Sequence, residues 1–313
     1  MVSVQKIYRE KFHLVYPLVA GLNSSFNEAD WNKALDYHWN RPEDYSGYGL
    51  FDGEQLVGFL GLIFSQRIID GKTENFVNLH SWIVKPEYRN HSLSLIIPIC
   101  RLKHHTITNT SPTLEVVEIM QKLGFQELDS RLKLLLPLNL FNRAIKNQNI
   151  KCITDTNEIA KHLDGEELNL FKDHLSYNDC QHLLVKYDRN YCYILYTQVN
   201  NYRFSYCYIH HISDRALFAR QHYLIRTKIS QMATNPWILV DSRMIKSIYV
   251  PFCYTLPFSF PKFYKSPSLQ PEQIDNLYSE LPLLNFSLLP NNFQGFKYLW
   301  HQSRQYRSLQ KNS

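Results

Sequence analysis

The chain has 313 residues, 44% of them apolar and 20% charged, with a formal net charge of +6. This composition is typical of a soluble globular protein and excludes a disordered chain. Lysine and arginine are spread along the sequence without a basic block, which argues against a nucleic-acid partner. No apolar run approaches the ~20 residues of a membrane span. Six cysteines without C-x-x-C or zinc-type spacing predict structural thiols in a reducing compartment, so we expect a cytoplasmic protein.

The first half alternates short strands with amphipathic helices. The three longest strands are separated by Asp52-Gly53 and Asp70-Gly71. Asp-Gly is a strong hairpin signal because glycine supplies the positive φ that such turns require, so these strands should form an antiparallel meander. In chain order the patterns predict a strand at 3–8, helices at 10–22 and 27–39, strands at 47–51, 55–69 and 73–84, a helix at 93–105, a strand at 105–108, a helix at 111–125 and a closing strand at 131–138.

The second half repeats this order. It predicts a strand at 150–154, helices at 157–163 and 165–175, strands at 182–188, 190–199 and 204–212, a helix at 216–232 and a strand at 237–241. The repeated order β-α-α-β-β-β-α-β indicates an internal duplication. From Pro251 onward, prolines interleaved with Phe and Tyr predict irregular packing segments with one short helix at 271–281. We expect two mixed α/β domains, at 1–140 and 150–313, each a mostly antiparallel sheet flanked by helices.

One stretch, WIVKPEYRNHSLSLII at residues 82 to 97, joins the last strand of the meander to the next predicted helix. A helix that starts directly after an apolar strand exposes backbone N–H groups that nothing inside the helix can satisfy. These groups and the positive end of the helix attract anions. The stretch therefore predicts an anion site at the end of the strand.

This stretch and a later segment resemble the GCN5-related N-acetyltransferase (GNAT) superfamily. In that family the fourth strand leads through V-x-P-x-x-R-x-x-G-x-G/A into the third helix. The match here is Val84, Pro86 and Arg89, with Ser92 and Ser94 where the family usually has glycines. A later helix of the family commonly ends Y-x-K-L-G-F, and this chain has MQKLGF at its matching helix. The resemblance covers residues 1 to 140 well and residues 150 to 245 in element order alone.

The resemblance implies that the loop and helix start hold the pyrophosphate of an acyl-coenzyme A, with an acetyl or a longer acyl group. The implied binding residues are Ile83, Val84, Arg89, Asn90, His91, Ser92, Leu93 and Ser94. Serine at the two glycine positions adds Cβ atoms that could crowd the phosphates, yet each hydroxyl can also donate to them. A purely structural alternative is that the serines cap a helix, Arg89 is solvated and the coenzyme site has been lost.

Acyl transfer to an amine needs a deprotonated acceptor, which a nearby base can supply. By two-residue alternation Asn78, His80 and Trp82 lie on one face of the strand, and Ser81 lies on the other. His80 is the candidate base because histidine titrates near neutral pH, with Ser81 as the alternative catalytic residue. A structural His80 fits the pattern equally well. Asn78 and Trp82 are candidate substrate-binding residues. The family often has a tyrosine acid where this chain has Met120, and the sequence indicates no metal site.

In the second half, the junction that matches this loop reads HHISDRALFARQ, with Arg215 but without the proline and the small residues. We therefore expect the second domain to bind no coenzyme and to help shape an acceptor groove. The chain is predicted to be an acyl-coenzyme A-dependent N-acyltransferase whose acceptor is the amine of an amino sugar, a metabolite or a peptide side chain. The alternative is a catalytically inactive GNAT-like binding module or partner subunit.

Overall fold

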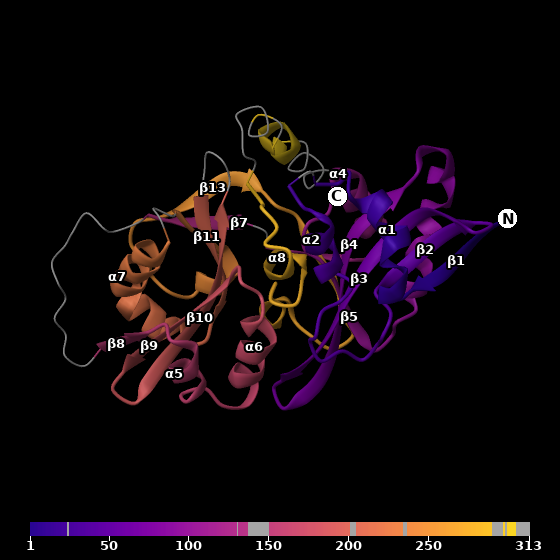
Figure 1. Cartoon of the computed structure of the whole chain (residues 1–313). Helices are drawn as coiled ribbons and strands as arrows, with labels where there is room; N and C mark the ends of the chain where they lie inside the picture. Colours follow the sequence, from indigo (N-terminus) through magenta and orange to yellow (C-terminus); the bar gives the residue numbers. More distant parts are fainter. Residues whose placement is uncertain are drawn as a thin grey trace. The chain divides into compact units, whose positions relative to one another are not determined.

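The structure is a computed structural model that describes residues 1–23, 25–129, 131–136, 150–200, 205–233, 237–289, 297 and 299–304. Its internal contacts divide the chain into two units. Unit 1 comprises residues 1–128 and 262–284, and unit 2 comprises residues 129–261 and 285–313. Each unit contains a seven-stranded mixed sheet flanked by helices (Figure 1). The predicted mixed α/β fold with two similar sheets is therefore confirmed.

The sheet of unit 1 is built around the predicted meander. Its strand order is β1-β2-β3-β4-β5-β14-β6. Strands β2, β3 and β4 pair antiparallel, and the turns between them place Gly53 and Gly71 at φ 60° and 76°. The two Asp-Gly signals are confirmed, because these φ values favour glycine. The strands are β1 Val2–Ile7, β2 Gly47–Asp52, β3 Gln55–Ile69, β4 Lys72–Val84, β5 His105–Asn109, β6 Gln126–Leu128 and β14 Lys262–Lys265.

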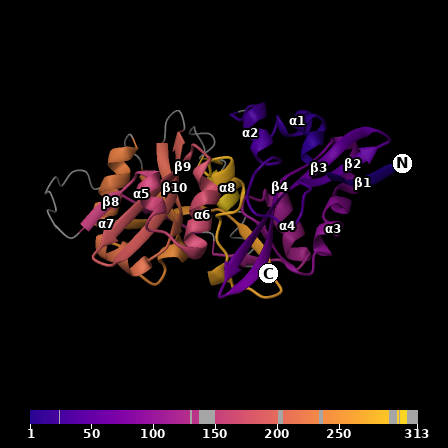
Figure 2. The same cartoon turned by 60° about the horizontal axis from the view of Figure 1, so that its bottom comes forward.

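Helices cover both faces of this sheet. Figure 2 shows α1 (Phe12–Val19) and α2 (Glu28–Lys33) on one side of it, and α3 (Ile97–Cys100) and α4 (Leu114–Lys122) on the other. A capping box at Asn27 starts α2. Apolar side chains of α1 and α2 form a core with β1, β2 and β3 that includes Ile7, Val15, Trp31, Leu35 and Phe59. Unit 1 also contains the short helices η1 Arg9–Lys11, η2 Pro86–Leu95, η4 Pro271–Gln273 and α8 Glu280–Leu283.

Three predicted helices differ from the structure. The helix predicted at 27–39 ends as α2 at Lys33. The segment 93–105 forms the end of η2 and the four-residue α3. Pro98 lies within the first turn of α3, and a proline cannot continue a helix that already runs through it because it lacks an N–H. The predicted helix 271–281 is also absent as one element: η4 ends at Gln273 and α8 begins at Glu280.

The sheet of unit 2 has the order β13-β7-β12-β11-β10-β9-β8. Helix α7 contacts β10 and β11, whereas α5 and α6 contact β9 (Figure 1). Buried Leu217, Ile225 and Ile229 of α7 pack on Ile194 and Ile209 of the sheet. The elements are β7 Arg131–Leu135, β8 Ile150–Ile153, α5 Thr156–Ala160, α6 Gly165–Leu175, β9 Cys180–Tyr187, β10 Asn190–Asn200, β11 Ser205–Ile212, α7 Arg215–Met232, β12 Trp237–Asp241, η3 Ser242–Ile245 and β13 Cys253–Ser259.

In each sheet, six strands follow one another in the chain, β1 to β6 or β8 to β13, and a seventh strand from outside this run is inserted between the last two. Strand β7 follows β6 in the chain but lies in the sheet of unit 2, between β12 and β13. Strand β14 comes from the C-terminal part of the chain but lies between β5 and β6 of unit 1. The prediction that residues 131–138 close the first domain is therefore wrong, and the segment after Pro251 contains two strands. The units are discontinuous in sequence, unlike the predicted ranges 1–140 and 150–313.

Candidate functional site

Strands β4 and β5 run parallel over a short distance and then separate. Their ladder joins residues 75–78 of β4 to residues 105–108 of β5. Beyond Asn78, β4 continues to Val84 and pairs with β3 alone in the described sheet. Backbone groups on the β5 side of this part of β4 therefore have no strand partner among the described residues. Such an edge can form hydrogen bonds with an extended ligand.

A bulge interrupts β4 where the two strands have separated. The register with β3 shifts between the pairs Gly61–His80 and Phe59–Ile83, so β4 has one residue more than β3 in this interval. Ser81 lies in the bulge with φ 49°, a left-handed value that is uncommon for a residue with a Cβ. Bulges and left-handed residues concentrate next to functional sites because they redirect side chains. The bulge is the strongest local sign of a site on β4.

The bulge also breaks the alternation on which the predicted faces depended. An extra residue between His80 and Ile83 shifts the facing of the side chains that follow it. The prediction that Trp82 shares a face with Asn78 and His80 therefore loses its basis. Asn78 is 1% exposed and His80 is buried, whereas Trp82 and Ser81 are partly exposed.

His80 lies in a dry environment. Its Nδ1 is 2.9 Å from Ser81 Oγ and shares a hydrogen bond with it. Its ring packs against the backbone of Gly61, where an added Cβ would lie 2.3 Å from His80 Nε2. Burial lowers the pKa of His80 to about 3. The ring is therefore neutral at physiological pH, and a proton-accepting role is disfavoured because the ring is only weakly basic.

A buried carboxylate lies where β4 and β5 separate. Glu280, the first residue of α8, is 2% exposed. Its carboxylate accepts hydrogen bonds from Asn78 Nδ2, from Thr110 Oγ1 at 2.7 Å and from Ser111 Oγ. Thr108 Oγ1 donates to Asn78 Oδ1 at 3.0 Å. The network joins Asn78, the last residue of β4 that pairs with β5, to the end of β5 and to α8 near the C-terminal end of the chain.

The sequence did not point to Glu280. It lies 202 positions from Asn78, and its local signal, an acid in a predicted short helix, is shared with the exposed Glu272. Nothing in the residue pattern distinguishes the two acids. The contact depends on β14 and α8 belonging to unit 1, which only the three-dimensional pairing establishes.

The loop after β4 is η2, a 3-10 helix with Pro86 at its start. Arg89, Asn90, His91 and Leu93 are exposed, and Ser92 and Ser94 are partly exposed. Ser94 Oγ donates to the His91 carbonyl at 2.6 Å, so this serine acts within the helix as a local cap. The predicted binding residues of the loop are thus brought together on an accessible segment directly after the bulged strand.

Arg89 also lies near the start of α4. The pKa of Glu115 is lowered by hydrogen bonds from its own backbone N–H and from Thr113, and further by the charge of Arg89. The exposed guanidinium therefore contributes positive charge at the first turn of α4, and it is available to an anion.

Comparison with solved structures identifies the fold. A conserved protein of unknown function from Enterococcus faecalis V583, described as a "Probable N-Acyltransferase", is 14% identical, with a TM-score of 0.58 over 87% of this chain and 74% of that one. A GCN5-related N-acetyltransferase from Anabaena variabilis ATCC 29413 is 11% identical, with a TM-score of 0.55 over 85% and 72%. One from Kribbella flavida is 12% identical, with a TM-score of 0.53 over 84% and 70%. The chain has the GNAT fold. No protein-family model and no curated protein matches it.

The GNAT fold of unit 1 departs from the pattern of the resemblance at two points. The helix expected to start after the loop is reduced to η2 and the four-residue α3. Met120, at the position of the family's usual tyrosine, is fully buried in α4 and has no hydroxyl to protonate a leaving thiolate. Neither departure closes the edge of β4 or covers Arg89.

Unit 2 joins its corresponding strand and helix differently. Only Ser213 and Asp214 separate β11 from α7, and the Asp214 side chain accepts from Leu217 N at 2.8 Å. This carboxylate already occupies the N-terminus of α7 and would repel a phosphate there. That unit 2 binds no coenzyme stays a prediction.

Two further features bear on the site. The described residues include no group of three or more His, Cys, Asp and Glu side chains arranged to hold a metal ion. Among the helices of the described ranges, none combines the length and the apolar character needed to cross a bilayer.

Proposed function

We propose that unit 1 transfers an acyl group from acyl-coenzyme A to an amine. The observation that carries the proposal is the separation of β4 from β5 beside the bulge at Ser81, followed directly by the exposed loop that bears Arg89. The edge of β4 offers backbone hydrogen bonds, and the loop offers positive charge for a pyrophosphate. Similarity to the solved N-acetyltransferases supports the fold on which this assignment rests.

The residues of the loop fit an acyl-coenzyme A in part. Arg89 is exposed and can pair with a phosphate through its guanidinium. Ser92 remains partly accessible, whereas the hydroxyl of Ser94 is engaged with the His91 carbonyl. We assign Ile83 and Val84 to the edge that holds the acyl arm, and residues 89 to 94 to the pyrophosphate.

The reaction is an attack of the amine nitrogen on the thioester carbonyl carbon. The C–N bond forms, the C–S bond breaks, and the thiolate leaves with the electron pair. A thiol with a pKa near 8.5 is a tolerable leaving group without an acid, which is consistent with Met120. A lysine-like amine must first lose a proton at a cost of about 4.6 kcal/mol at pH 7. That proton passes to water. The nitrogen loses a second proton as the amide forms, and the departing thiolate takes it up to become the free thiol.

We assign a joint role to His80 and Ser81, whose side chains are hydrogen-bonded to each other. The neutral ring of His80 holds the Ser81 hydroxyl at 2.9 Å, and the bulge presents Ser81 at the open edge of β4. In this arrangement Ser81 orients the acceptor or the water that takes its proton, and His80 is a positioning residue. Of the two predicted acceptor-binding residues, the partly exposed Trp82 remains our candidate, whereas Asn78 is buried and its amide is bonded to Glu280 and Thr108, so we assign Asn78 to bracing the strand. The acceptor is the amine of an amino sugar, a metabolite or a peptide side chain.

Coenzyme binding tests the proposal. Ser92→Phe places a bulky side chain in the loop and should abolish binding of acetyl-coenzyme A in calorimetry. Arg215→Ala, at the exposed start of α7, is the matched control and should bind as the parent does. Equal losses in both variants, or a parent protein that binds no acyl-coenzyme A of any chain length, would reject the assignment. Binding without release of free thiol toward any amine would favour the inactive module.

A further inference from the structure

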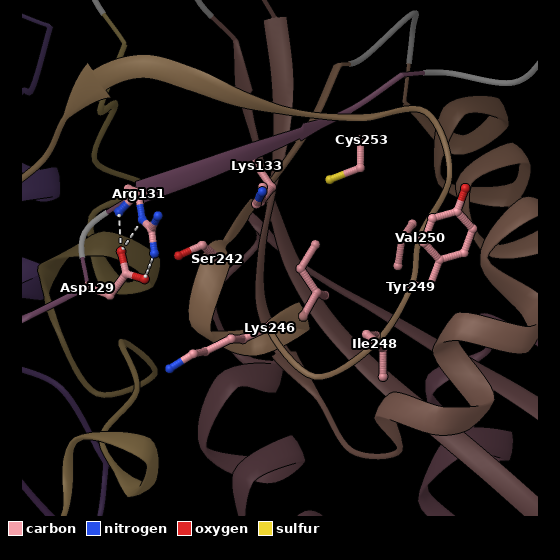
Figure 3. Close-up of a pocket in the computed structure, with 10 residues that line it drawn as sticks. Asp129, Arg131, Lys133, Ser242, Lys246, Ile248, Tyr249, Val250 and Cys253 are labelled. Carbon is pink, nitrogen blue, oxygen red and sulfur yellow. Dashed lines mark hydrogen bonds and ion pairs between the residues drawn. The ribbon is translucent and has the colours of Figure 1, made fainter.

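Unit 2 contains a pocket on the side of β7 that faces η3 and the connection to β13. Its volume is about 270 Å³. At roughly 30 Å³ per water molecule, this space holds a small organic molecule as well as an inorganic ion. The pocket is lined by Asp129, Arg131, Lys133, Ser242, Ile245, Lys246, Ile248, Tyr249, Val250 and Cys253 (Figure 3).

The pocket lies where unit 2 differs from unit 1. In unit 1 the chain passes from β5 into the nine-residue helix α4 before β6. In unit 2 the corresponding passage from β12 to β13 contains the four-residue η3 and a loop. The residues that line the pocket come from β7 and from Asp129 shortly before it, from η3, from this loop and from the first residue of β13. The shorter passage leaves one face of β7 accessible.

The charges of the pocket gather at one end. Figure 3 shows Asp129, Arg131, Ser242 and Lys246 on one side of the pocket, and Ile248, Tyr249 and Val250 on the other. The lining holds three cationic side chains, of Arg131, Lys133 and Lys246, against the single carboxylate of Asp129. The charged end therefore carries a net positive charge.

The negative charge of the single carboxylate is already compensated by Arg131. Arg131 donates to Asp129 through Nε at 2.9 Å and through Nη2 at 2.6 Å. These hydrogen bonds lower the pKa of Asp129 to about 2. Asp129 therefore stays ionised and holds the guanidinium in place. Lys246 is exposed, and Lys133 donates one hydrogen bond to Thr255 Oγ1 at 2.7 Å, so both ammonium groups retain donors for an anion.

The wall opposite η3 is held by a buried guanidinium. Arg226 of α7 is 0% exposed and donates to the carbonyls of Leu136 at 3.0 Å, Pro251 at 2.7 Å and Phe252 at 3.1 Å. These bonds tie the residue after β7 to Pro251 and Phe252, which lie between Val250 of the loop and the start of β13. The site is therefore largely formed before a ligand enters, which lowers the cost of binding.

We propose that this pocket binds a phosphate monoester, with its phosphate between Lys133 and Lys246 and its organic group against Ile248 and Val250. A dianion matches the surplus of positive charge better than a monoanionic carboxylate does. The apolar end accommodates an aromatic or aliphatic group, which inorganic phosphate lacks. This site is independent of the proposed acyl transfer.

Calorimetry with phenyl phosphate tests the site on the full chain. We expect binding by the parent, about tenfold weaker binding by Lys133→Gln and by Lys246→Gln, and weaker binding of benzoate and of inorganic phosphate than of phenyl phosphate. Lys172→Gln removes an exposed lysine on α6 of the same unit and should bind phenyl phosphate as the parent does. All three variants should bind acetyl-coenzyme A as the parent does, which separates this site from unit 1.

Several outcomes would overturn the proposal. A parent dissociation constant weaker than about 1 mM leaves no specific site. Lys133→Gln and Lys246→Gln variants that bind phenyl phosphate as tightly as the parent show that these lysines do not form the site. A loss of affinity in Lys172→Gln equal to theirs shows binding by general surface charge. Benzoate bound as tightly as phenyl phosphate contradicts the preference for a dianion. Thermal melting of each variant checks that a loss of binding does not come from unfolding.

Discussion

His80 shows how burial changes the chemistry of a side chain. Its ring packs on Gly61, its Nδ1 bonds Ser81, and its pKa falls to about 3 because the charged form loses its hydration. A histidine in the unfolded chain has a pKa near 6.5. Between these two values the unfolded chain binds a proton that the folded protein does not, so His80 destabilises the fold as the pH falls.

The first prediction concerns this linkage. Unfolding free energy should fall by up to about 1.4 kcal/mol per pH unit between pH 6.5 and pH 4 on account of His80. Above pH 7.5 the contribution of His80 should be constant. His80→Gln cannot titrate, so urea denaturation of this variant should show a shallower slope in the acid range. The slope, rather than the stability at one pH, is the readout.

Two results would contradict this account of His80. An unchanged acid slope in His80→Gln would show that the ring is protonated in the fold. A parent pH–rate profile with an acid limb near pH 6.5, together with a hundredfold loss of turnover in the variant, would assign the proton-accepting role to His80.

At the residue scale the sequence predicted some backbone features and missed others for a physical reason. Glycines 53 and 71 follow aspartates, and this pair of residue types encodes its own turn. Ser81 adopts a left-handed φ without glycine or asparagine, because its neighbours in the folded sheet impose it. The predicted strand was therefore correct, whereas the faces of its side chains beyond His80 were not determined.

At the scale of elements, the segment from β14 to α8 completes unit 1. Tyr264, Leu269 and Ile274 join Phe76 and Leu128 in one apolar cluster. Arg67 of β3 forms an ion pair with Asp275 at 2.9 Å. Glu280 then closes the hydrogen-bond network of Asn78, as described above. This segment fixes the geometry at the separation of β4 and β5.

The second prediction concerns Glu280. Glu280→Ala leaves the donors of Asn78, Thr110 and Ser111 without their acceptor, and each buried unsatisfied group costs about 1–3 kcal/mol. We expect a loss of at least about 3 kcal/mol of unfolding free energy in urea denaturation. Glu272→Ala, which removes an exposed acid of the same segment, should stay within about 0.5 kcal/mol of the parent. Similar stability of the two variants would rule out a bracing role for Glu280.

This segment was beyond the reach of local sequence patterns. Strand β14 has four residues and lies just after Pro261, so proline density predicted irregular structure there. Its strand conformation comes from pairing with β5 and β6, more than 130 positions away in the chain. Short strands of this kind are specified by their partners rather than by their own residues.

At the scale of the whole molecule, the duplication is visible in the two sheet orders. Strands β1 to β5 of unit 1 correspond to β8 to β12 of unit 2, as the repeated sequence order predicted. The sixth position is filled by β14 in one sheet and by β7 in the other. A sequence can show that an order of strands and helices is repeated, because the residue patterns that predict each element are local. It cannot show which sheet an apolar strand joins, because that choice depends on distant edges.

The last prediction follows from this exchange of strands. A fragment of residues 1–140 contains every strand of the predicted first domain but lacks β14, so β5 has an unpaired edge and β6 has lost its neighbour in the sheet. Such an edge promotes aggregation. We expect this fragment to lack a cooperative thermal transition by circular dichroism.

A rearranged polypeptide supplies the control. Leu128 and Lys262 pair across the antiparallel β6–β14 ladder, so a two-residue Asn-Gly turn can connect them directly. The polypeptide 1–128–Asn-Gly–262–284 restores β14 and Glu280 to one continuous chain, and it should melt cooperatively. Both polypeptides omit β8 to β13, but the fragment 1–140 also contains β7. A third polypeptide of residues 1–128 lacks β7 as the rearranged one does, so its comparison with the rearranged one isolates the segment 262–284 and the turn that joins it. Cooperative melting of the fragment 1–140 at the same temperature would show that unit 1 folds without its exchanged strand.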